Sequence, residues 1–212
     1  TIIKNGSGVI DSTFTTGSYL NEIKNNISGD LTYKHKFKES GNLNINAHYT
    51  YFDLERSQDV NSNYFLPNGS FIRDFNFSTN ANQQIEIKTA QLDFNDNLGS
   101  VFFETGVKGS FINSESKLDY TLKNNGSVFI PNLSDDYIYD ENVLAAYFSF
   151  SKDWEKWSLK TGLRAEQTES SGISANISTI NNLSYFELFP SLYLLHNINE
   201  HHSLSFDYSR KL

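Results

Sequence analysis

The stretch N-V-L-A-A-Y-F-S-F-S-K-D-W-E-K-W-S-L-K-T-G-L-R-A-E-Q-T-E-S, residues 142–170, decides the fold class. Apolar and polar residues alternate along both of its halves, so that Leu163 and Arg164, for example, would point to opposite faces of one strand. Such alternation is typical of β-strands with two different faces. The segment 154–156 between the two halves is short enough for a tight turn. The stretch therefore predicts a hairpin of two antiparallel strands.

The same alternation recurs along most of the chain, and helical periodicity is hard to find. It predicts an all-β protein with about eight long strands, arranged as antiparallel up-and-down hairpins. We expect these strands at residues 26–38, 42–55, 83–95, 99–113, 142–153, 157–170, 184–197 and 202–211. Residues 1–25 are expected to be irregular, which leaves 26–212 as the strand-bearing portion.

The predicted connections alternate strictly in length. Tight turns are expected at Glu39-Ser40-Gly41, Asp96-Asn97-Leu98, Trp154-Glu155-Lys156 and Asn199-Glu200-His201. Long polar loops are expected at 56–82, 114–141 and 171–183. Soluble domains seldom contain structureless loops of such length, whereas barrels of the bacterial outer membrane combine short turns on one side with long loops on the other. The predicted strands also exceed the usual length of about 5 to 6 residues and reach the 9 to 11 or so that cross a membrane.

Composition narrows the class further. The 212 residues are 38% hydrophobic and 15% aromatic, with neither cysteine nor methionine, and no apolar run is long enough for a membrane helix. Helical membrane proteins, disulfide scaffolds and thiol chemistry are therefore excluded. The formal net charge of −8, without a basic block, argues against nucleic acid as a partner.

Aromatic residues gather at the predicted tight turns, where an interfacial girdle would place them. Two charges on an otherwise apolar face, Glu86 and Lys88, fall at the opposite end of their strand. There they would stand above a bilayer, while Ala90, Leu92 and Phe94 continue into it. This arrangement favours a transmembrane barrel segment over a soluble sandwich.

A family resemblance rests on four ordered motifs. They are L-A-A-Y at 144–147, G-L-R-A-E-Q-T at 162–168, F-P-S at 189–191 and H-S-L-S-F-D-Y-S-R at 202–210. In this order and at hairpin spacing, they resemble the barrel of TonB-dependent outer-membrane receptors of the Bacteroidetes type. The likeness is carried mainly by residues 141–212.

The resemblance implies a barrel of about 22 strands in the outer membrane of a Gram-negative bacterium. An N-terminal plug domain would fill it, and TonB would drive uptake of a scarce nutrient of the siderophore, vitamin, glycan or peptide class. No plug is recognised in residues 1–212, so these residues are expected to form about a third of such a barrel. The implied partners are membrane lipid, the rest of the barrel with its plug, TonB through the N-terminal part and a surface lipoprotein. An enzymatic role, a cofactor and a metal ion are not expected.

The polar faces of the predicted strands supply the candidate site. They place a mixed set of charges toward the lumen, where the side chains either contact a substrate or plug or form structural ion pairs with one another. The set comprises Glu104, Lys108, Lys160, Arg164, Glu166 and Asp207. No catalytic pairing stands out. The histidines 196, 201 and 202 and the acidic group Asp135, Asp136, Asp140 and Glu141 are interpreted as interface, turn and loop residues rather than metal ligands.

Three other interpretations remain open at this stage. The chain could form a small closed barrel of about eight strands with a structural or adhesive role. It could be an outer-membrane enzyme acting on lipid through His48 and an inward serine. It could be a soluble extracellular β-sandwich, for which the predicted strands are long and the loop pattern is unusually regular.

Overall fold

The strands continue far beyond the limits that alternation predicts. The computed structural model describes residues 1–4, 6–37, 41–124, 126–177 and 179–210. Its strands are β1 (Ile2–Lys4), β2 (Ile10–Lys36), β3 (Asn42–Phe65), β4 (Phe71–Leu98), β5 (Val101–Leu122), β6 (Val128–Phe129), β7 (Asp135–Asp153), β8 (Trp157–Ser174), β9 (Thr179–Asn199) and β10 (His202–Ser209), with one short 3₁₀ helix, η1 (Pro131–Leu133). The longest of them, β4, has 28 residues.

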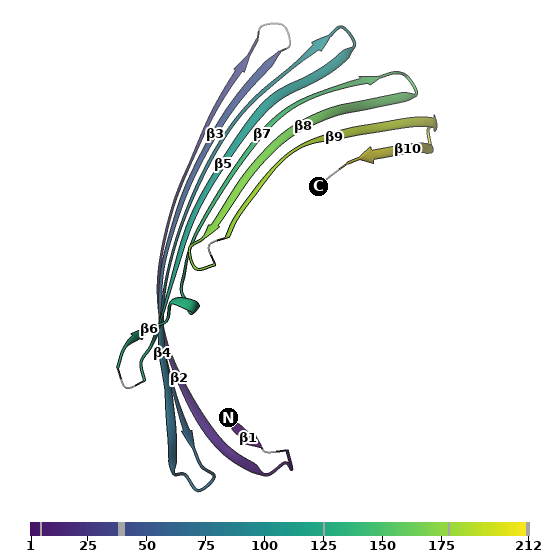
Figure 1. The fold of residues 1–212 in the computed structure, drawn as a ribbon. Coiled ribbons are helices and arrows are strands. Elements are labelled where there is room, and N and C mark those ends of the chain that lie inside the picture. Colours follow the sequence, from purple (N-terminus) through teal and green to yellow (C-terminus); the bar gives the residue numbers. More distant parts are fainter. Residues whose placement is uncertain (5, 38–40, 125, 178, 211–212) are drawn as a thin grey trace.

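All ten of these strands belong to one sheet. Each strand pairs antiparallel with the next in the order β1-β2-β3-β4-β5-β7-β8-β9-β10, and β6 adds to the end of β5. The sheet is strongly curved and open, so that β1 and β10 lie at opposite edges (Figure 1). The predicted all-β, antiparallel, up-and-down fold is confirmed. Within the described residues there is no second sheet, as a sandwich needs, and no closure of the barrel.

Three of the predicted tight turns can be compared with the structure. The backbone N–H of Trp154 donates to the carbonyl of Trp157 at 2.7 Å, which closes the predicted turn between β7 and β8. The turn between β9 and β10 is also found where expected. The turn after β4 is shifted to residues 99–100, because Gly99 adopts a φ of 64° that suits a two-residue hairpin. Of the first predicted turn, Glu39 and Ser40 lie outside the described residues.

The predicted long loops are wrong. Residues 56–65 and 71–82 belong to β3 and β4, 114–122 and 135–141 to β5 and β7, and 171–174 and 179–183 to β8 and β9. The prediction that residues 1–25 are irregular is also wrong, because β2 begins at Ile10. In β3, β4 and β5 one cause is a change of phase: within each of these strands the apolar residues move from one face to the other, and a strand whose alternation changes phase resembles a strand that has ended.

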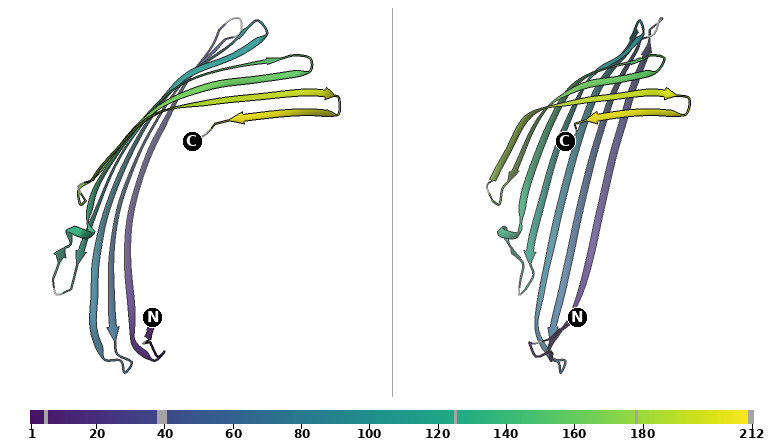
Figure 2. Two further views of the ribbon diagram at one scale, coloured as in Figure 1. Left: turned by 45° about the vertical axis from the view of Figure 1, so that its right-hand side comes forward. Right: turned by 90° about the vertical axis from the view of Figure 1, so that its right-hand side faces the viewer.

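β3 illustrates this change of phase. Near its first turn the apolar residues are at odd positions, Leu43 and Ile45, whereas farther along they are at even positions, Phe52 and Leu54. We call the part of the sheet next to the end of β2, the start of β3 and the turns at 99–100, 154–156 and 200–201 the band half, and the other part the far half. Figure 2 shows both halves as one continuous curved surface.

The convex face of the band half is apolar. In β7, side chains at even positions such as Leu144 and Phe148 are exposed, while their odd neighbours are more covered. Because side chains converge on the inside of a curved sheet, the covered face is the concave one. We call the convex apolar side chains of the band half the outer band; it includes Ile27, Leu31, Phe37, Ile45, Leu92, Val107, Leu144, Phe148, Leu163, Phe186, Leu188, Leu204 and Phe206.

The outer band has the height of a hydrocarbon layer. From Ile27 in β2 to Phe37, the residue directly after β2, it covers ten residue steps, or about 33 Å of extended chain. On a strand tilted by about 45° this length spans roughly 23 Å, close to the apolar belt of about 25 Å in outer-membrane barrels. Among the described residues, no helix is long and apolar enough to cross a membrane.

Candidate functional site

The concave face of the band half carries the polar residues that the sequence singles out. Strand register places all six candidates, Glu104, Lys108, Lys160, Arg164, Glu166 and Asp207, on this one face. They come from β5, β8 and β10. The structure thus brings the set to a common surface, although it holds nothing bound to that surface, and their contact with a substrate stays a prediction.

Four of the six take part in ion pairs. The ammonium group of Lys160 lies 3.5 Å from Glu104, whose carboxylate also accepts a hydrogen bond from Ser149 at 3.3 Å. Arg164 pairs with Glu166 at 2.5 Å on the same strand. The first pair links β8 to β5 across the intervening β7, and the second lies within β8. Each pair joins one positive and one negative group, so the four residues leave little net charge facing the lumen.

The other two candidates stand apart. Among the described residues, neither the ammonium group of Lys108 nor the carboxylate of Asp207 has a side-chain ion-pair partner within 4.0 Å. On β5, Lys108 lies directly opposite Gln91 of β4 on one side and Ala145 of β7 on the other. Of the six, these two are therefore the most available to a molecule that occupies the lumen.

A tyrosine cluster at the centre of this face was not found from the sequence. The hydroxyl of Tyr147 donates to Asp93 and accepts a hydrogen bond from Gln91 at 3.2 Å. The guanidinium group of Arg164 lies 5.7 Å from the centre of the tyrosine ring. The ring crosses Gly106 on the neighbouring strand, where an added Cβ would lie 2.5 Å from the hydroxyl oxygen. Gly106 is required here because it leaves room for the ring.

The sequence signal for this cluster was present but unspecific. Tyr147 ends the L-A-A-Y motif, and Gly106 is its direct partner across β5 and β7. A tyrosine and a glycine 41 positions apart become neighbours only once the register between their strands is known.

His48 also belongs to the concave face. Its Nδ1 lies 2.7 Å from Asp30, and its Nε2 lies 2.8 Å from the hydroxyl of Thr50. Both ring nitrogens are thus engaged, and the hydroxyl belongs to a threonine rather than to the inward serine that a lipid-cleaving enzyme was expected to use.

Two carboxylates of the far half have shifted pKa values. The hydrogen bond from Lys24 lowers the pKa of Glu22, and the positive charge of Arg56 at 3.0 Å acts in the same direction. At the start of β7, hydrogen bonds from the backbone N–H of Asn176 and from the Ser174 hydroxyl lower the pKa of Asp135. Asp135, the first residue of β7, thus connects the start of this strand to the turn after β8.

On β3, β4 and β5 the concave face of the far half is apolar, opposite to the band half. The ring of Phe77 stacks on Tyr120 at 5.0 Å between centroids and contacts Phe75 at 5.7 Å. We call this set the inner patch; it comprises Phe52, Leu54, Val60, Phe75, Phe77, Ile85, Ile87, Ile112, Tyr120 and Leu122. Its members are half-buried on the inside of the curve.

The metal-ligating residue types do not assemble. Within the part of the chain that the structure describes, no three His, Asp or Glu side chains could hold one ion. His196 instead stacks on Trp157, with 4.0 Å between ring centroids, and His202 bonds to Asn199. The acidic group at 135–141 is divided between the two faces, because Asp135 is concave and Asp140 convex.

The sheet is wide, curved and antiparallel, with an apolar band on its convex face and charged residues on its concave face. A comparison with protein families agrees with this architecture. The outer membrane protein β-barrel family matches residues 35–212. The chain belongs to this family. Membership places it in the outer membrane of a Gram-negative bacterium and identifies the outer band as the surface that faces lipid. The concave charges of this family member accordingly face the lumen, and the far half stands clear of the hydrocarbon.

Two solved structures are similar to this outer-membrane barrel chain. The unliganded ferric citrate transporter FecA aligns with a TM-score of 0.45 and 14% identity, over 87% of this chain and 34% of that one. The ferric yersiniabactin uptake receptor FyuA of Yersinia pestis aligns with a TM-score of 0.41 and 12% identity, over 94% of this chain and 38% of that one. The chain thus spans little more than a third of either protein. Among curated proteins, none matches it in sequence.

Placement in the membrane accounts for Glu86 and Lys88. Both are on the convex face, and their side chains pair at 2.8 Å where the outer band gives way to polar residues. A charge at the membrane boundary costs about 0 to 1 kcal/mol, against about 2 to 4 kcal/mol for Arg or Lys at the midplane. They lie at the far edge of the band, but near the middle of β4 rather than at the strand end that the sequence predicts, because β4 continues to Phe71.

Proposed function

We propose that residues 10–210 form part of the barrel wall of a TonB-dependent receptor that imports a scarce nutrient across the outer membrane. One observation carries the proposal: the lumenal face of the band half is largely polar and bears charged residues on β2, β4, β5, β8, β9 and β10, while the sheet remains open and broadly curved (Figure 2). A small closed barrel fills its interior with its own side chains. A wall of this kind suits a lumen wide enough for another domain.

The ordered motifs of the last four long strands support the same function. L-A-A-Y, G-L-R-A-E-Q-T, F-P-S and H-S-L-S-F-D-Y-S-R resemble the corresponding barrel segments of TonB-dependent receptors. One of these residues, Tyr147, is built into the lumenal cluster with Asp93 and Arg164. The motif residues thus contribute to the surface that a plug domain would contact.

The charge pattern suggests how a plug would be held. Lys108 and Asp207 have opposite charges and no ion-pair partner among the described residues. Each would pair with a charge of the plug, because an ionised group that faces a filled lumen needs a partner. The paired groups Lys160, Glu104, Arg164 and Glu166 would stiffen the wall around it. TonB would act through the plug, and a surface lipoprotein would cover the mouth.

The transport proposal is tested by uptake in the native bacterium. Deleting the gene should abolish uptake of one nutrient among a labelled ferric siderophore, a vitamin, an oligosaccharide and a peptide, and a plasmid copy should restore it. Collapse of the energy supply to TonB should have the same effect as the deletion. Normal uptake of all four nutrients in the deletion strain would contradict the proposal.

A second experiment addresses the lumenal charges. Lys108→Ala should lower uptake several-fold with normal amounts of barrel in the membrane, while Lys4→Ala on the short edge strand should leave it unchanged. If both variants transport like the parent protein, Lys108 has no part in holding the plug or guiding the nutrient.

A further inference from the structure

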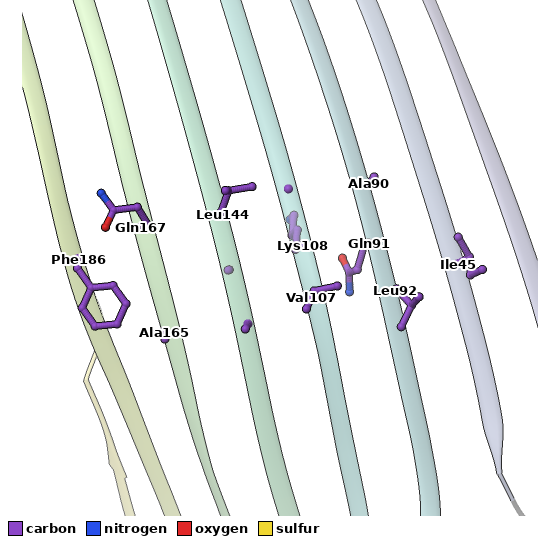
Figure 3. A pocket seen from close by; sticks show the side chains of 13 residues that line it. Ile45, Ala90, Gln91, Leu92, Val107, Lys108, Leu144, Ala165, Gln167 and Phe186 are labelled. Atoms are coloured by element: carbon purple, nitrogen blue, oxygen red, sulfur yellow. The ribbon is translucent and has the colours of Figure 1, made fainter.

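A shallow apolar groove crosses the outer band. It is lined by convex side chains in two adjacent cross-strand rows and by Gln91, Lys108 and Ala145 of the concave-face row between them, and it has a volume of about 540 Å³. Figure 3 shows these side chains on successive strands from β3 to β9. One residue from each strand marks its course: Ile45, Ala90, Val107, Leu144, Ala165 and Phe186.

The length of the groove suits an extended hydrocarbon chain. Its six strands are separated by five spacings of about 4.8 Å, which gives a length of about 24 Å. The groove is shallow, so a chain would lie along its apolar floor rather than be enclosed by it.

The course of the groove fits one leaflet of the bilayer, on the side of the far half. At β3 it begins at Ile45, within the outer band, and at β8 and β9 it reaches Gln167 and Phe186, where the convex face becomes polar. Because the groove runs across strands inclined by about 45°, its length of about 24 Å corresponds to a depth of roughly 17 Å, close to half of a hydrocarbon core of about 30 Å.

A polar pocket adjoins the boundary end. Glu169 and Ser184 form the next convex pair after Gln167 and Phe186, and Gln167 donates a hydrogen bond to Ser184 at 3.0 Å. The pocket has a volume of about 370 Å³. The convex side chains that line it are Asp140, Asn142, Glu169, Ser171, Asn182 and Ser184. It contains two carboxylates and no lysine or arginine, so it suits hydroxyl or ammonium donors rather than a bare phosphate.

We propose that the groove and the pocket together bind one membrane lipid, with an acyl chain in the groove and a donor-bearing head group in the pocket. The groove is continuous with the lipid-facing surface that family membership establishes, so hydrocarbon is the occupant at hand. Leu144 and Ala165 contact the chain, and Glu169 accepts hydrogen bonds from the head group. The proposal rests on the position of the membrane and is independent of what the protein transports.

The test is native mass spectrometry of the full-length protein. It would be reconstituted with phosphatidylethanolamine, a glycosyl diacylglycerol or phosphatidylcholine and then released into mild detergent. The parent protein should retain one molecule of either of the first two lipids and at least tenfold less phosphatidylcholine, whose head group has no donor. The double variant Ala146→Leu/Ala165→Leu, which fills the groove, should retain at least tenfold less of every lipid. Leu31→Phe, a convex change outside the groove, should retain as much as the parent.

The head group has its own variant. Glu169→Gln should lower the retention of phosphatidylethanolamine more than that of the glycosyl lipid, because only the first loses a charge partner. Equal retention in the filled variant and the Leu31→Phe control would overturn the proposal, as would equal retention of phosphatidylcholine. Should the filled variant fail to fold, a lipid with a photoactivatable acyl chain decides: it should label the parent near Leu144 and Phe186, and labelling spread evenly over the outer band would contradict the site.

Discussion

In β3, β4 and β5 the two halves of each strand place their apolar side chains on opposite faces with the same backbone geometry. In the band half the apolar side chains point outward, as at Leu163, and the charges point inward, as at Arg164. In the far half, Phe77 points inward and Ser78 outward. A sheet that leaves the bilayer exchanges lipid for water on its convex side, so its apolar face must turn to the interior. The change of phase therefore marks the membrane boundary within the sequence.

The halves also differ in what stabilises them. The concave face of the band half depends on ion pairs and hydrogen bonds, such as Lys160 with Glu104 and His48 with Asp30. The inner patch depends on aromatic stacking and half-buried aliphatic contacts. A charge introduced on the convex face should therefore destabilise the band half more than the far half, whereas truncation of a concave aromatic side chain should destabilise the far half.

The largest expected effect comes from a charge on the lipid-facing side. Leu163→Arg should destabilise the folded barrel by about 2 to 4 kcal/mol, because it places a guanidinium in hydrocarbon near the midplane. Ser171→Arg, on the same face of the same strand but in the far half, should cost less than about 0.5 kcal/mol. Denaturant unfolding of the full-length protein in lipid vesicles measures both. Equal costs would show that the membrane boundary does not separate these positions.

Glycines beneath tyrosines give the next contrast. Gly106→Ala should cost about 1 to 3 kcal/mol, because its Cβ would lie 2.5 Å from the Tyr147 hydroxyl and 2.7 Å from the backbone carbonyl of Leu92. Gly172→Ala in the far half meets only the outer end of the Tyr137 ring, and its effect should be smaller. The same unfolding assay applies. A larger cost at Gly172 would mean that the Tyr147 ring is not fixed over Gly106.

The inner patch should respond to truncation. Phe77→Ala removes contacts with Tyr120 and Phe75 and should cost about 1 to 2 kcal/mol, less than the 3 to 5 kcal/mol typical of a fully buried phenylalanine. Tyr19→Ala, on the exposed convex side, is the matched control and should be nearly neutral. Proteolysis of intact cells, followed by mapping of the cut sites, would show whether the far half loosens. A neutral Phe77→Ala would indicate that the patch is not packed.

The smallest expected effect is the pH dependence of amide protection near Asp135, at the start of β7. The pKa of Asp135 lies below its ordinary value, so the stabilisation by its carboxylate is present above the ordinary carboxyl pKa and is lost as the pH falls through the lowered one. Protection of the Ala175 and Asn176 amides, corrected for intrinsic exchange rates, should decrease over that acidic range. In Asp135→Asn this pH dependence should disappear, whereas Asp136→Asn should retain it. Unchanged protection in acid would remove Asp135 from this role.

Much of the fold followed from local pattern. The hairpin at 154–156 and the alternation on both sides of it predict two membrane-crossing strands correctly, because residue spacing alone decides which face a side chain takes. The far half was missed, because Asn, Ser and Asp in residues such as 56–63 are typical of loops when a strand is considered alone. Pairing with two neighbours over the whole length makes that segment a strand.

The candidate site shows a similar division. The polar face with Lys160 and Arg164 could be predicted from alternation, and its six residues do share one surface. The pairing of Lys160 with Glu104 and the contact of Tyr147 with Asp93 join residues more than 50 positions apart. Such contacts depend on strand register, which alternation does not specify.

The sequence by itself determined that this chain forms long, two-faced antiparallel strands and that one face of them is suited to lipid. Only the tertiary structure decided that the strands continue through the change of phase, which face lies inside the curve and which charges meet. The physical reason is that a side chain's direction is set by its own backbone, whereas its surroundings are set by strands distant in sequence. Curvature and register belong to the sheet as a whole, and they turn two ambiguous faces into an outer surface and a lumen.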